Sequence, residues 1–269
     1  DSILKGKLVI VTGGASGIGY GLVCEALARG AGHVVVADLN ADALASAVAS
    51  IADARVSSYQ IDVSSESAVA EMVATAEAKH GGTGLYISNA GVLFADRPDF
   101  TIFAQDAAAW QTSWDVNVMA HLHACRAVLP GMIERGAGGF LITASAAGLL
   151  SQMGAASYST TKHAAVGFAE SLAISHGDDG IYVGALCPQA VESNMSKGAE
   201  QSTAAADGIL PADMVAKHTF DAMAEGHFMI RPHTNVEQYF QHKAQDYDRW
   251  VGTMRKIRRA QIARTGEPL

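Results

Sequence analysis

Disulfide and metal-binding patterns are missing from this 269-residue chain. Its three cysteines, Cys24, Cys125 and Cys187, are odd in number and far apart, and no histidine has the spacing of a metal ligand. Cysteines placed in this way form neither a disulfide framework nor a zinc site. We therefore expect no bound metal and three free, buried thiols in a reducing compartment.

Positive charge and long apolar runs are also scarce. Lysine and arginine total 19 against 27 aspartate and glutamate residues, which gives a formal net charge of −8. Nucleic-acid binding needs a basic face, so this balance argues against a nucleic-acid partner. The longest apolar runs, such as "LVIVT" and "HVVVAD", are strand-length, and the opening "DSILKGK" has no signal-peptide core. We expect a cytoplasmic protein without a membrane partner.

Hydrophobic residues, by contrast, make up 49% of the chain, and they form short β-branched runs that alternate with alanine-rich helical segments. The strands read as nearly continuous apolar runs, which is typical of a parallel sheet buried on both faces. The predicted fold class is α/β: one domain, residues 1–269, with a doubly wound sheet of about seven parallel strands and helices on both faces. The predicted strands are 7–12, 33–38, 55–62, 84–89, 139–145, 181–187 and 227–231, and the predicted helices are 18–29, 41–51, 65–79, 106–134, 157–176 and 211–225.

A glycine-rich stretch, "TGGASGIGYG", joins the first predicted strand to the first helix. Glycine at such a turn lets the backbone approach a pyrophosphate, whose charge the free N–H groups of the helix start favour. The alternative is a glycine-rich turn without a ligand, which the position between strand and helix makes less favoured. The residues assigned to this phosphate site are Gly13, Ser16, Gly17, Ile18 and Gly19.

An aspartate, Asp38, ends the second predicted strand about twenty residues beyond the glycine loop. A carboxylate there can accept a hydrogen bond from a ribose 2′-hydroxyl and would repel a 2′-phosphate. No basic residue is adjacent, since Leu39 follows Asp38 and Ser16 precedes Gly17. Asp38 could instead cap the next helix, although Asn40 is better placed to do so. NAD is therefore the predicted cofactor, in preference to NADP.

The segment "SYSTTKHAA" places Tyr158 and Lys162 four residues apart, so that a helix brings both side chains to one face. Taken alone, such a pair more often marks an amphipathic helix with a solvated lysine. The glycine loop, Asp38 and a serine at the end of the fifth predicted strand, Ser145, favour a catalytic role instead.

Several motifs occur together in the order and spacing of one enzyme family. "TGGASGIG", "NAG" at 89–91, Asn117, Ser145 and "YSTTK" at 158–162 resemble the short-chain dehydrogenase/reductases over roughly residues 5–232. The resemblance implies a single Rossmann-type domain with seven parallel strands. It also implies a homotetramer or dimer assembled through the long helices, here 106–134 and 157–176.

The resemblance also implies roles for individual residues. Tyr158 matches the catalytic acid/base, Lys162 the lysine that binds the nicotinamide ribose and lowers the tyrosine pKa, and Ser145 the serine that holds the substrate oxygen. Asn117 matches the asparagine that holds a proton-relay water. One departure is Gln189, which stands where the family usually has glycine. Further cofactor contacts are implied for Asp62, Val63, Asn89, Ala90, Gly91, Pro188 and Val191.

The chemistry predicted from these residues interconverts an alcohol and a ketone. Free tyrosine titrates near ~10, and a cation one helical turn away favours its ionised form. We expect Lys162 to lower the pKa of Tyr158, and Ser145 to hydrogen-bond the developing alkoxide. Two alternatives stay open: an NAD-binding regulatory protein without turnover, and transient oxidation used for epimerisation or dehydration.

The predicted substrate pocket is mostly apolar, which favours a hydrophobic secondary alcohol or ketone, cyclic or aromatic, over a phosphorylated or polyhydroxylated sugar; a hydroxysteroid is an alternative. Each apolar residue could equally be ordinary packing. Residues 192–210 are predicted to be a substrate lid or a plain surface connection. The tail, about 235–269, is predicted to pack as a helix on a neighbouring subunit or to present a solvated basic face. The predicted pocket residues are Leu93, Phe94, Leu149, Leu150, Met153, Gln189 and Met195.

Overall fold

A seven-stranded parallel sheet forms the centre of the protein, with the strands in the order β3-β2-β1-β4-β5-β6-β7. The computed structural model describes residues 3–97, 99–193, 195 and 202–266. The chain steps outward from β1 to β3, returns to β4 beside β1, and then continues to β7 on the other side. This reversal opens a crevice at the carboxyl ends of β1 and β4. The strands are β1 (Leu8–Thr12), β2 (His33–Asp38), β3 (Val56–Gln60), β4 (Thr83–Ser88), β5 (Gly138–Thr143), β6 (Ile181–Leu186) and β7 (Met229–Ile230).

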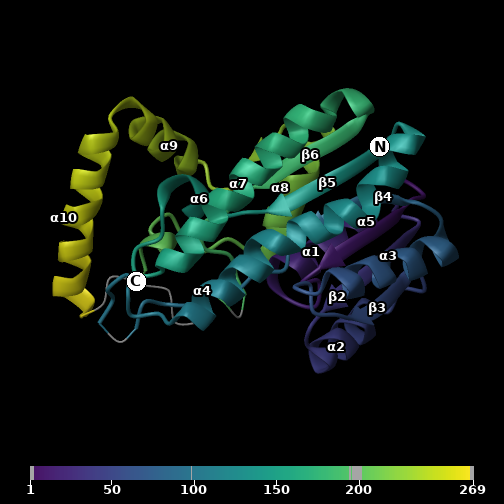
Figure 1. Ribbon diagram of the computed structural model, residues 1–269, viewed down its shortest axis with the longest axis horizontal. Helices are drawn as coiled ribbons and strands as arrows, with labels where there is room; N and C mark the ends of the chain where they lie inside the picture. The colour runs from purple at the N-terminus through teal and green to yellow at the C-terminus, as the bar shows by residue number, and fades with distance from the viewer. Residues whose placement is uncertain (1–2, 98, 194, 196–201, 267–269) are drawn as a thin grey trace.

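Helices cover both faces of the sheet (Figure 1). All residues of β1, β4 and β5 are buried, as expected for strands with a helical layer on each side. One hydrophobic core lies under α3, α5 and α7, and a second lies under α1, α2 and α8. The helices are α1 (Gly17–Ala28), α2 (Ala41–Ile51), α3 (Glu66–His80), α4 (Ala107–Trp114), α5 (Ala120–Arg135), α6 (Ala147–Leu150), α7 (Ala156–His176), α8 (Ala212–Ala224), α9 (Asn235–Gln245) and α10 (Tyr247–Thr265).

The predicted α/β class and parallel sheet are confirmed, with most element boundaries within three residues. The predicted helix 106–134 is interrupted, because a π-helical turn at Asp115–Met119 separates α4 from α5. Single π-turns of this kind are often found at functional sites. The turn contains Asn117, which the sequence had marked as a site residue.

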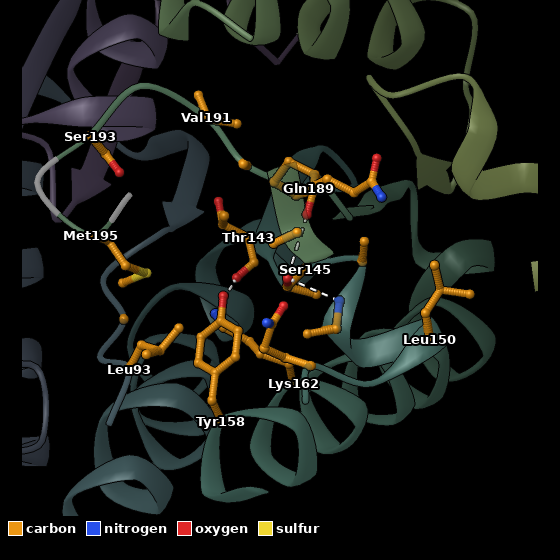
Figure 2. Close-up of a pocket in the computed structure, with 18 of the residues that line it drawn as sticks. Leu93, Thr143, Ser145, Leu150, Tyr158, Lys162, Gln189, Val191, Ser193 and Met195 are labelled. Atoms are coloured by element: carbon orange, nitrogen blue, oxygen red, sulfur yellow. Dashed lines mark hydrogen bonds between the residues drawn. The ribbon is translucent and has the colours of Figure 1, made fainter. Parts of the chain in front are cut away.

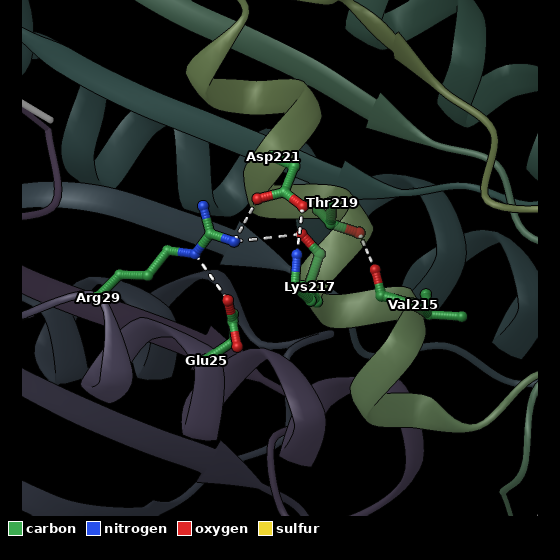
Figure 3. Close-up of polar contacts among 6 residues, drawn as sticks. All are labelled: Glu25, Arg29, Val215, Lys217, Thr219 and Asp221. Atoms are coloured by element: carbon green, nitrogen blue, oxygen red, sulfur yellow. Dashed lines mark hydrogen bonds and ion pairs between the residues drawn. The ribbon is translucent and has the colours of Figure 1, made fainter.

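Close contact between α1 and α8 fixes the helix that follows the glycine loop. A Cβ at Gly21 would lie 2.7 Å from the Ala212 carbonyl oxygen, so only glycine permits this approach. At the far end of α1, Arg29 Nε lies 2.7 Å from Glu25 Oε1 and Arg29 Nη2 lies 2.6 Å from Asp221 Oδ1 (Figure 3). These pairs are partly exposed and each contributes at most about 1 kcal/mol.

Two helices extend the chain beyond the last strand. Figure 1 shows α9 and α10 in yellow, on the side of the molecule toward which the β5 arrow points. The buried Lys243 on α9 donates to the Leu149 carbonyl oxygen at the end of α6, at 2.5 Å. Arg258 on α10 donates to the Phe100 carbonyl oxygen at 3.0 Å. Among the described helices, none is long and apolar enough to span a membrane.

Candidate active site

A large cavity opens at the carboxyl ends of the strands, where the parallel topology predicts a ligand site. Its volume is about 1800 Å³, and its lining runs from the glycine loop past Ser145 and Tyr158 to α9 and α10. Single-ligand pockets are typically ~300–1,000 Å³. The cavity is therefore large enough for a dinucleotide and a second molecule beside it.

The glycine loop has the conformation of a phosphate cradle. Gly13 and Gly17 have φ angles of 62° and 51°, which favour glycine. A Cβ at Gly19 would lie 2.0 Å from the Gly13 carbonyl oxygen, so a side chain there would break the loop. Asn89 supports the same turn, because its Nδ2 donates to the Thr12 and Gly13 carbonyl oxygens at 3.0 and 3.2 Å. No side chain caps the start of α1, which leaves its backbone N–H groups for an anion.

Asp38 lies at the cavity edge, at the end of β2. Its carboxylate accepts hydrogen bonds from the backbone N–H groups of Ala15 and Asn40, at 3.2 and 3.1 Å. Asn40, not Asp38, caps α2 by accepting from Ala43 N. The capping alternative for Asp38 is therefore wrong, and its carboxylate is held in place at the lining of the cavity.

The predicted adenine-side and sheet-end residues also reach the cavity. Asp62 is held by the Ser64 hydroxyl at 2.7 Å, and the Val63 carbonyl oxygen lies 3.2 Å from His123 Nδ1. A Cβ at Gly91 would lie 3.3 Å from Asn117 Oδ1 and 3.4 Å from Lys162 Nζ. The other lining residues among those predicted for the cofactor are Ser16, Gly17, Ile18, Leu39, Asn89, Ala90, Pro188 and Val191.

Ser145, Tyr158 and Lys162 converge on the cavity from β5 and α7, as Figure 2 shows. Tyr158 is 9% exposed and Lys162 only 3%, so the solvated-face alternative for this pair is wrong. Lys162 Nζ donates to the Thr143 carbonyl oxygen at 2.8 Å and lies 5.7 Å from the centre of the Tyr158 ring. Ser145 hydrogen-bonds the Tyr158 side chain, and its Oγ accepts from Ala147 N at 3.0 Å.

Burial controls the titration of this pair. It raises the pKa of Tyr158, which the hydrogen bond from Ser145 opposes. It lowers the pKa of Lys162 to about 8. The expected lowering of the Tyr158 pKa by Lys162 is not found, because the loss of hydration outweighs attraction and the ammonium group is directed at Thr143. The lysine is still close enough to stabilise a phenolate while it carries its proton.

Asn117 lies behind the cavity wall, and it is fully buried in the π-turn. Its Oδ1 accepts from Val92 N at 2.9 Å, and its Nδ2 donates to the Val92 carbonyl oxygen at 2.9 Å and to Thr161 Oγ1 at 3.0 Å. The side chain therefore joins the segment after β4 to α7 one residue from Lys162. It is not among the residues that line the cavity.

Comparison with known proteins agrees with this geometry. The sequence profile described as short chain dehydrogenase matches residues 7–204. The chain belongs to the short-chain dehydrogenase/reductase family.

Relatives of known name support the same grouping. A 3beta-hydroxysteroid dehydrogenase 2 from Eggerthella lenta is 33% identical over 204 residues, which cover 75% of this chain and 77% of that protein. A 2,5-dichloro-2,5-cyclohexadiene-1,4-diol dehydrogenase from Sphingobium indicum is 35% identical over 204 residues, 76% of this chain and 80% of that protein. A crystal structure of a short-chain dehydrogenase/reductase from Burkholderia phymatum in complex with NAD has a TM-score of 0.81 and 28% identity, covering 91% of this chain and 95% of that one.

The substrate side of this short-chain dehydrogenase/reductase differs in part from the sequence prediction. Leu93, Leu150, Gln189 and Met195 line the cavity. Phe94, Leu149 and Met153 are not among the lining residues. Leu149 is 3% exposed and packs in the core under α7, because the short helix α6 presents its neighbour Leu150 to the cavity instead.

The proposed lid, 192–210, falls partly on residues 194 and 196–201, which lie outside the described part of the chain. Its second half is tied to the loop after β6, since Ala190 N donates to the Ala204 carbonyl oxygen at 3.2 Å. Residues at this end also line the cavity: Ser202, Thr203, Ala204 and Ala206.

Sequence reasoning missed the contribution of the C-terminal helices. The predicted single tail helix is two helices that separate at Asp246, whose carboxylate caps α10 by accepting from Arg249 N at 2.9 Å. The i, i+4, i+7 spacing of Trp250, Met254 and Ile257 would have predicted one apolar face, and these side chains line the cavity of their own chain. Arg255, Lys256 and Arg259 are exposed, as the solvated-face alternative proposed.

His233 was also missed, because a lone histidine after a short strand carries no pattern. It is 4% exposed and spans the loop after β6, with Nδ1 3.2 Å from Gln189 N and Nε2 3.1 Å from the Ala190 carbonyl oxygen. Burial lowers its pKa, which favours the neutral ring that these two contacts require. Among the described residues, no group of three or more histidine, cysteine or acidic side chains could hold a metal ion.

Proposed function

We propose that this protein is an NAD(H)-dependent oxidoreductase that interconverts a hydrophobic secondary alcohol and its ketone. One observation carries the proposal: Ser145, Tyr158 and Lys162 meet in the same cavity as the glycine loop and Asp38. A family of alcohol-oxidising relatives supports the reaction class. The substrate and the roles of the individual residues are our inference.

NAD is supported as the cofactor by the site itself and by a relative. The Asp38 carboxylate is fixed where a ribose hydroxyl would be bound, and the similar structure from Burkholderia phymatum was determined with NAD. Gly13, Gly19 and the start of α1 would hold the pyrophosphate, and Lys162 would bind the ribose next to the nicotinamide. When bound, NAD accepts a hydride from the alcohol carbon or returns it to the ketone.

Side chains of this protein transfer the proton to and from the reacting oxygen. Tyr158 takes this proton during oxidation and gives it back during reduction. Lys162, charged below a pH of about 8, stabilises the phenolate at short range. Ser145 holds the substrate oxygen beside Tyr158, and stabilises its developing charge with a preorganised hydrogen bond. Asn117 positions the segment after β4 against α7, which keeps Lys162 in place.

The substrate is proposed to be apolar, cyclic or aromatic, on account of the side chains that face it. Leu93 and Leu150 lie beside the catalytic pair, and Trp250, Met254 and Ile257 form the outer wall. The relatives from Eggerthella lenta and Sphingobium indicum are named for a hydroxysteroid and a cyclohexadiene diol, which are ring alcohols.

An NAD-coupled screen tests the proposal. The purified protein is incubated with NAD and with cyclohexanol, cyclohexane diols, bicyclic terpene alcohols, a 3-hydroxysteroid and sugar alcohols, and NADH formation is followed by its absorbance. We expect turnover of ring alcohols above sugar alcohols. NADH binding without turnover of any alcohol would favour a non-catalytic nucleotide-binding protein, and product formation without net NADH would favour epimerisation or dehydration.

We further propose that the protein assembles as a homotetramer or dimer through α4–α5 and α7, as the sequence predicted. A groove between α5 and α7 is lined by Leu122, Leu129, Ile133 and Phe168, and Ile133 is 37% exposed. Native mass measurement of the full chain and of an Ile133→Glu variant tests this, with a monomeric mass for the unaltered chain contradicting it. The same measurement on a chain lacking 240–269 tests the tail as a subunit contact, with an unchanged mass contradicting that role.

A further inference from the structure

Gln189 has an unusual setting at the cavity wall. It follows Pro188 directly after β6 and lines the cavity near Ser145, whose Oγ lies 3.4 Å from the Pro188 carbonyl oxygen. The amide oxygen of Gln189 is buried and has no hydrogen-bond partner within the described part of the chain. Buried amide groups in folded proteins are nearly always hydrogen-bonded. Gln189 as a whole is partly exposed and lines the cavity, so its unpartnered carboxamide can turn toward a ligand there.

The backbone beneath Gln189 is held rigidly. His233 accepts from Gln189 N at 3.2 Å through Nδ1, and its Nε2 lies 3.1 Å from the Ala190 carbonyl oxygen. The next residues are tied as well, since Glu192 N donates to the Leu210 carbonyl oxygen at 3.0 Å. A fixed backbone removes the cost of ordering the loop when a ligand binds, which is the arrangement expected of a recognition residue.

The direction of the side chain places it on the substrate side. In Figure 2 the carboxamide of Gln189 points away from Tyr158, on the side of Ser145 where Leu150 lies. Val191 and Ser193, which follow the loop toward the glycine turn, lie on the opposite side of the view. Ser193 is the residue that a Cβ on Gly17 would meet, at 2.9 Å, so that opposite side belongs to the nucleotide.

Two other polar side chains on this side, from α9, already have partners. Tyr239 donates its hydroxyl to Asp207 at 3.1 Å, and Lys243 donates to the Leu149 carbonyl oxygen. The neighbouring Leu150 offers no hydrogen bond, so the carboxamide of Gln189 is a polar group beside an apolar side chain of this wall.

We propose that Gln189 is a specificity-determining residue that binds a second oxygen of the substrate, apart from the oxygen that reacts at Tyr158. The inference rests on the proposed function. A carboxamide both donates and accepts, so the second oxygen can belong to a hydroxyl or a carbonyl group. The preferred substrate class is therefore a ring alcohol or ketone with one further oxygen on an otherwise apolar skeleton.

A matched series of alcohols tests this. With saturating NAD, kcat/KM is measured for cyclohexanol and for cyclohexane-1,2-, 1,3- and 1,4-diol, on the unaltered protein and on Gln189→Met, which keeps the length of the side chain and removes its hydrogen bonds. We expect at least one diol to exceed cyclohexanol by about tenfold, after correction for its two hydroxyls, and the ratio to fall to near one in Gln189→Met.

A control variant tests whether a Gln→Met substitution away from the cavity changes the preference. Gln241→Met carries the same change on α9, where Gln241 donates to Glu237 at 2.6 Å and does not line the cavity. It should keep the preference for the diol. The inference is wrong if no diol exceeds cyclohexanol, if Gln189→Met keeps the same ratio, or if a monohydric alcohol is oxidised and the diols are not. NADH binding without oxidation of any alcohol would instead overturn the proposed function.

Discussion

The ammonium nitrogen of Lys162 lies 5.7 Å from the centre of the Tyr158 ring, and both side chains are buried. Burial raises the pKa of the phenol and lowers that of the amine to about 8. The phenol is thus harder to ionise, and the amine easier to discharge, than either group in water. Lys162 is charged only below a pH of about 8, which limits the pH range in which it can stabilise a Tyr158 phenolate.

The pH dependence of alcohol oxidation follows from this pair. Lys162 loses its charge with a pKa of about 8, so kcat/KM for alcohol oxidation should fall above pH 8, where the Tyr158 phenolate loses its neighbouring cation. In Lys162→Met this fall near pH 8 should be absent, and kcat/KM below pH 8 should be lower than in the unaltered protein. Steady-state kinetics between pH 6 and 10 measure both profiles. Superimposable profiles would mean that Lys162 does not assist Tyr158.

Cofactor preference is predicted to depend on Asp38. The change Asp38→Asn keeps an oxygen that can accept from Ala15 N and removes the negative charge. We expect kcat/KM with NAD to fall by about tenfold to a hundredfold and kcat/KM with NADP to rise. Measurement of kcat/KM for NAD and for NADP with the same alcohol gives the ratio of the two values. A variant that favours NAD as strongly as the unaltered protein would show that Asp38 does not select the cofactor.

The glycine loop should not tolerate a side chain at Gly19. A Cβ there would lie 2.0 Å from the Gly13 carbonyl oxygen, so Gly19→Ala must distort the turn and should abolish measurable NADH binding. Gly252→Ala on α10 is the matched control, since nothing lies within 4 Å of its Cβ position. It should keep NADH affinity and raise the free energy of unfolding by about 0.5–1 kcal/mol. NADH fluorescence titration separates the two outcomes, and normal affinity in Gly19→Ala contradicts the cradle.

Acid stability should depend on His121, a fully buried residue with Nδ1 2.7 Å from Ser88 Oγ. Burial lowers the pKa of His121 to about 3 in the folded protein. In the unfolded chain the same imidazole binds a proton near pH 6.5. Stability is therefore lost as the pH falls from about 6.5 toward 3, by up to about 1.4 kcal/mol per unit. Urea unfolding at pH 7 and 5 should show the advantage of the unaltered protein over His121→Gln shrinking by about 2 kcal/mol. An unchanged difference would place the acid sensitivity elsewhere.

The sheet and the glycine loop were predictable because their patterns are local. Apolar runs in β1, β4 and β5 identify strands buried on both faces. Gly13 is required by its positive φ angle, and Gly19 by contact with the Gly13 carbonyl oxygen six residues earlier. The pairing of Tyr158 with Lys162 follows from one helical turn. Each of these signals lies within about twenty residues of sequence.

The remaining features depend on contacts between distant segments. The π-turn around Asn117 has no sequence mark, and the raised pKa of Tyr158 follows from burial by several elements. The same holds for His233, which reaches across from the end of β7 to Gln189. The choice of Leu150 rather than Leu149 as a cavity residue depends on the orientation of α6, which periodicity over four residues does not determine.

The central claim is that Tyr158 carries the proton of the reacting oxygen next to bound NAD. Its most direct test is Tyr158→Phe, assayed for NAD reduction with the best ring alcohol from the screen, together with NADH titration. The account predicts that kcat falls by at least about a hundredfold while NADH affinity stays within a few-fold of the unaltered protein. Turnover within tenfold of the unaltered protein would contradict it.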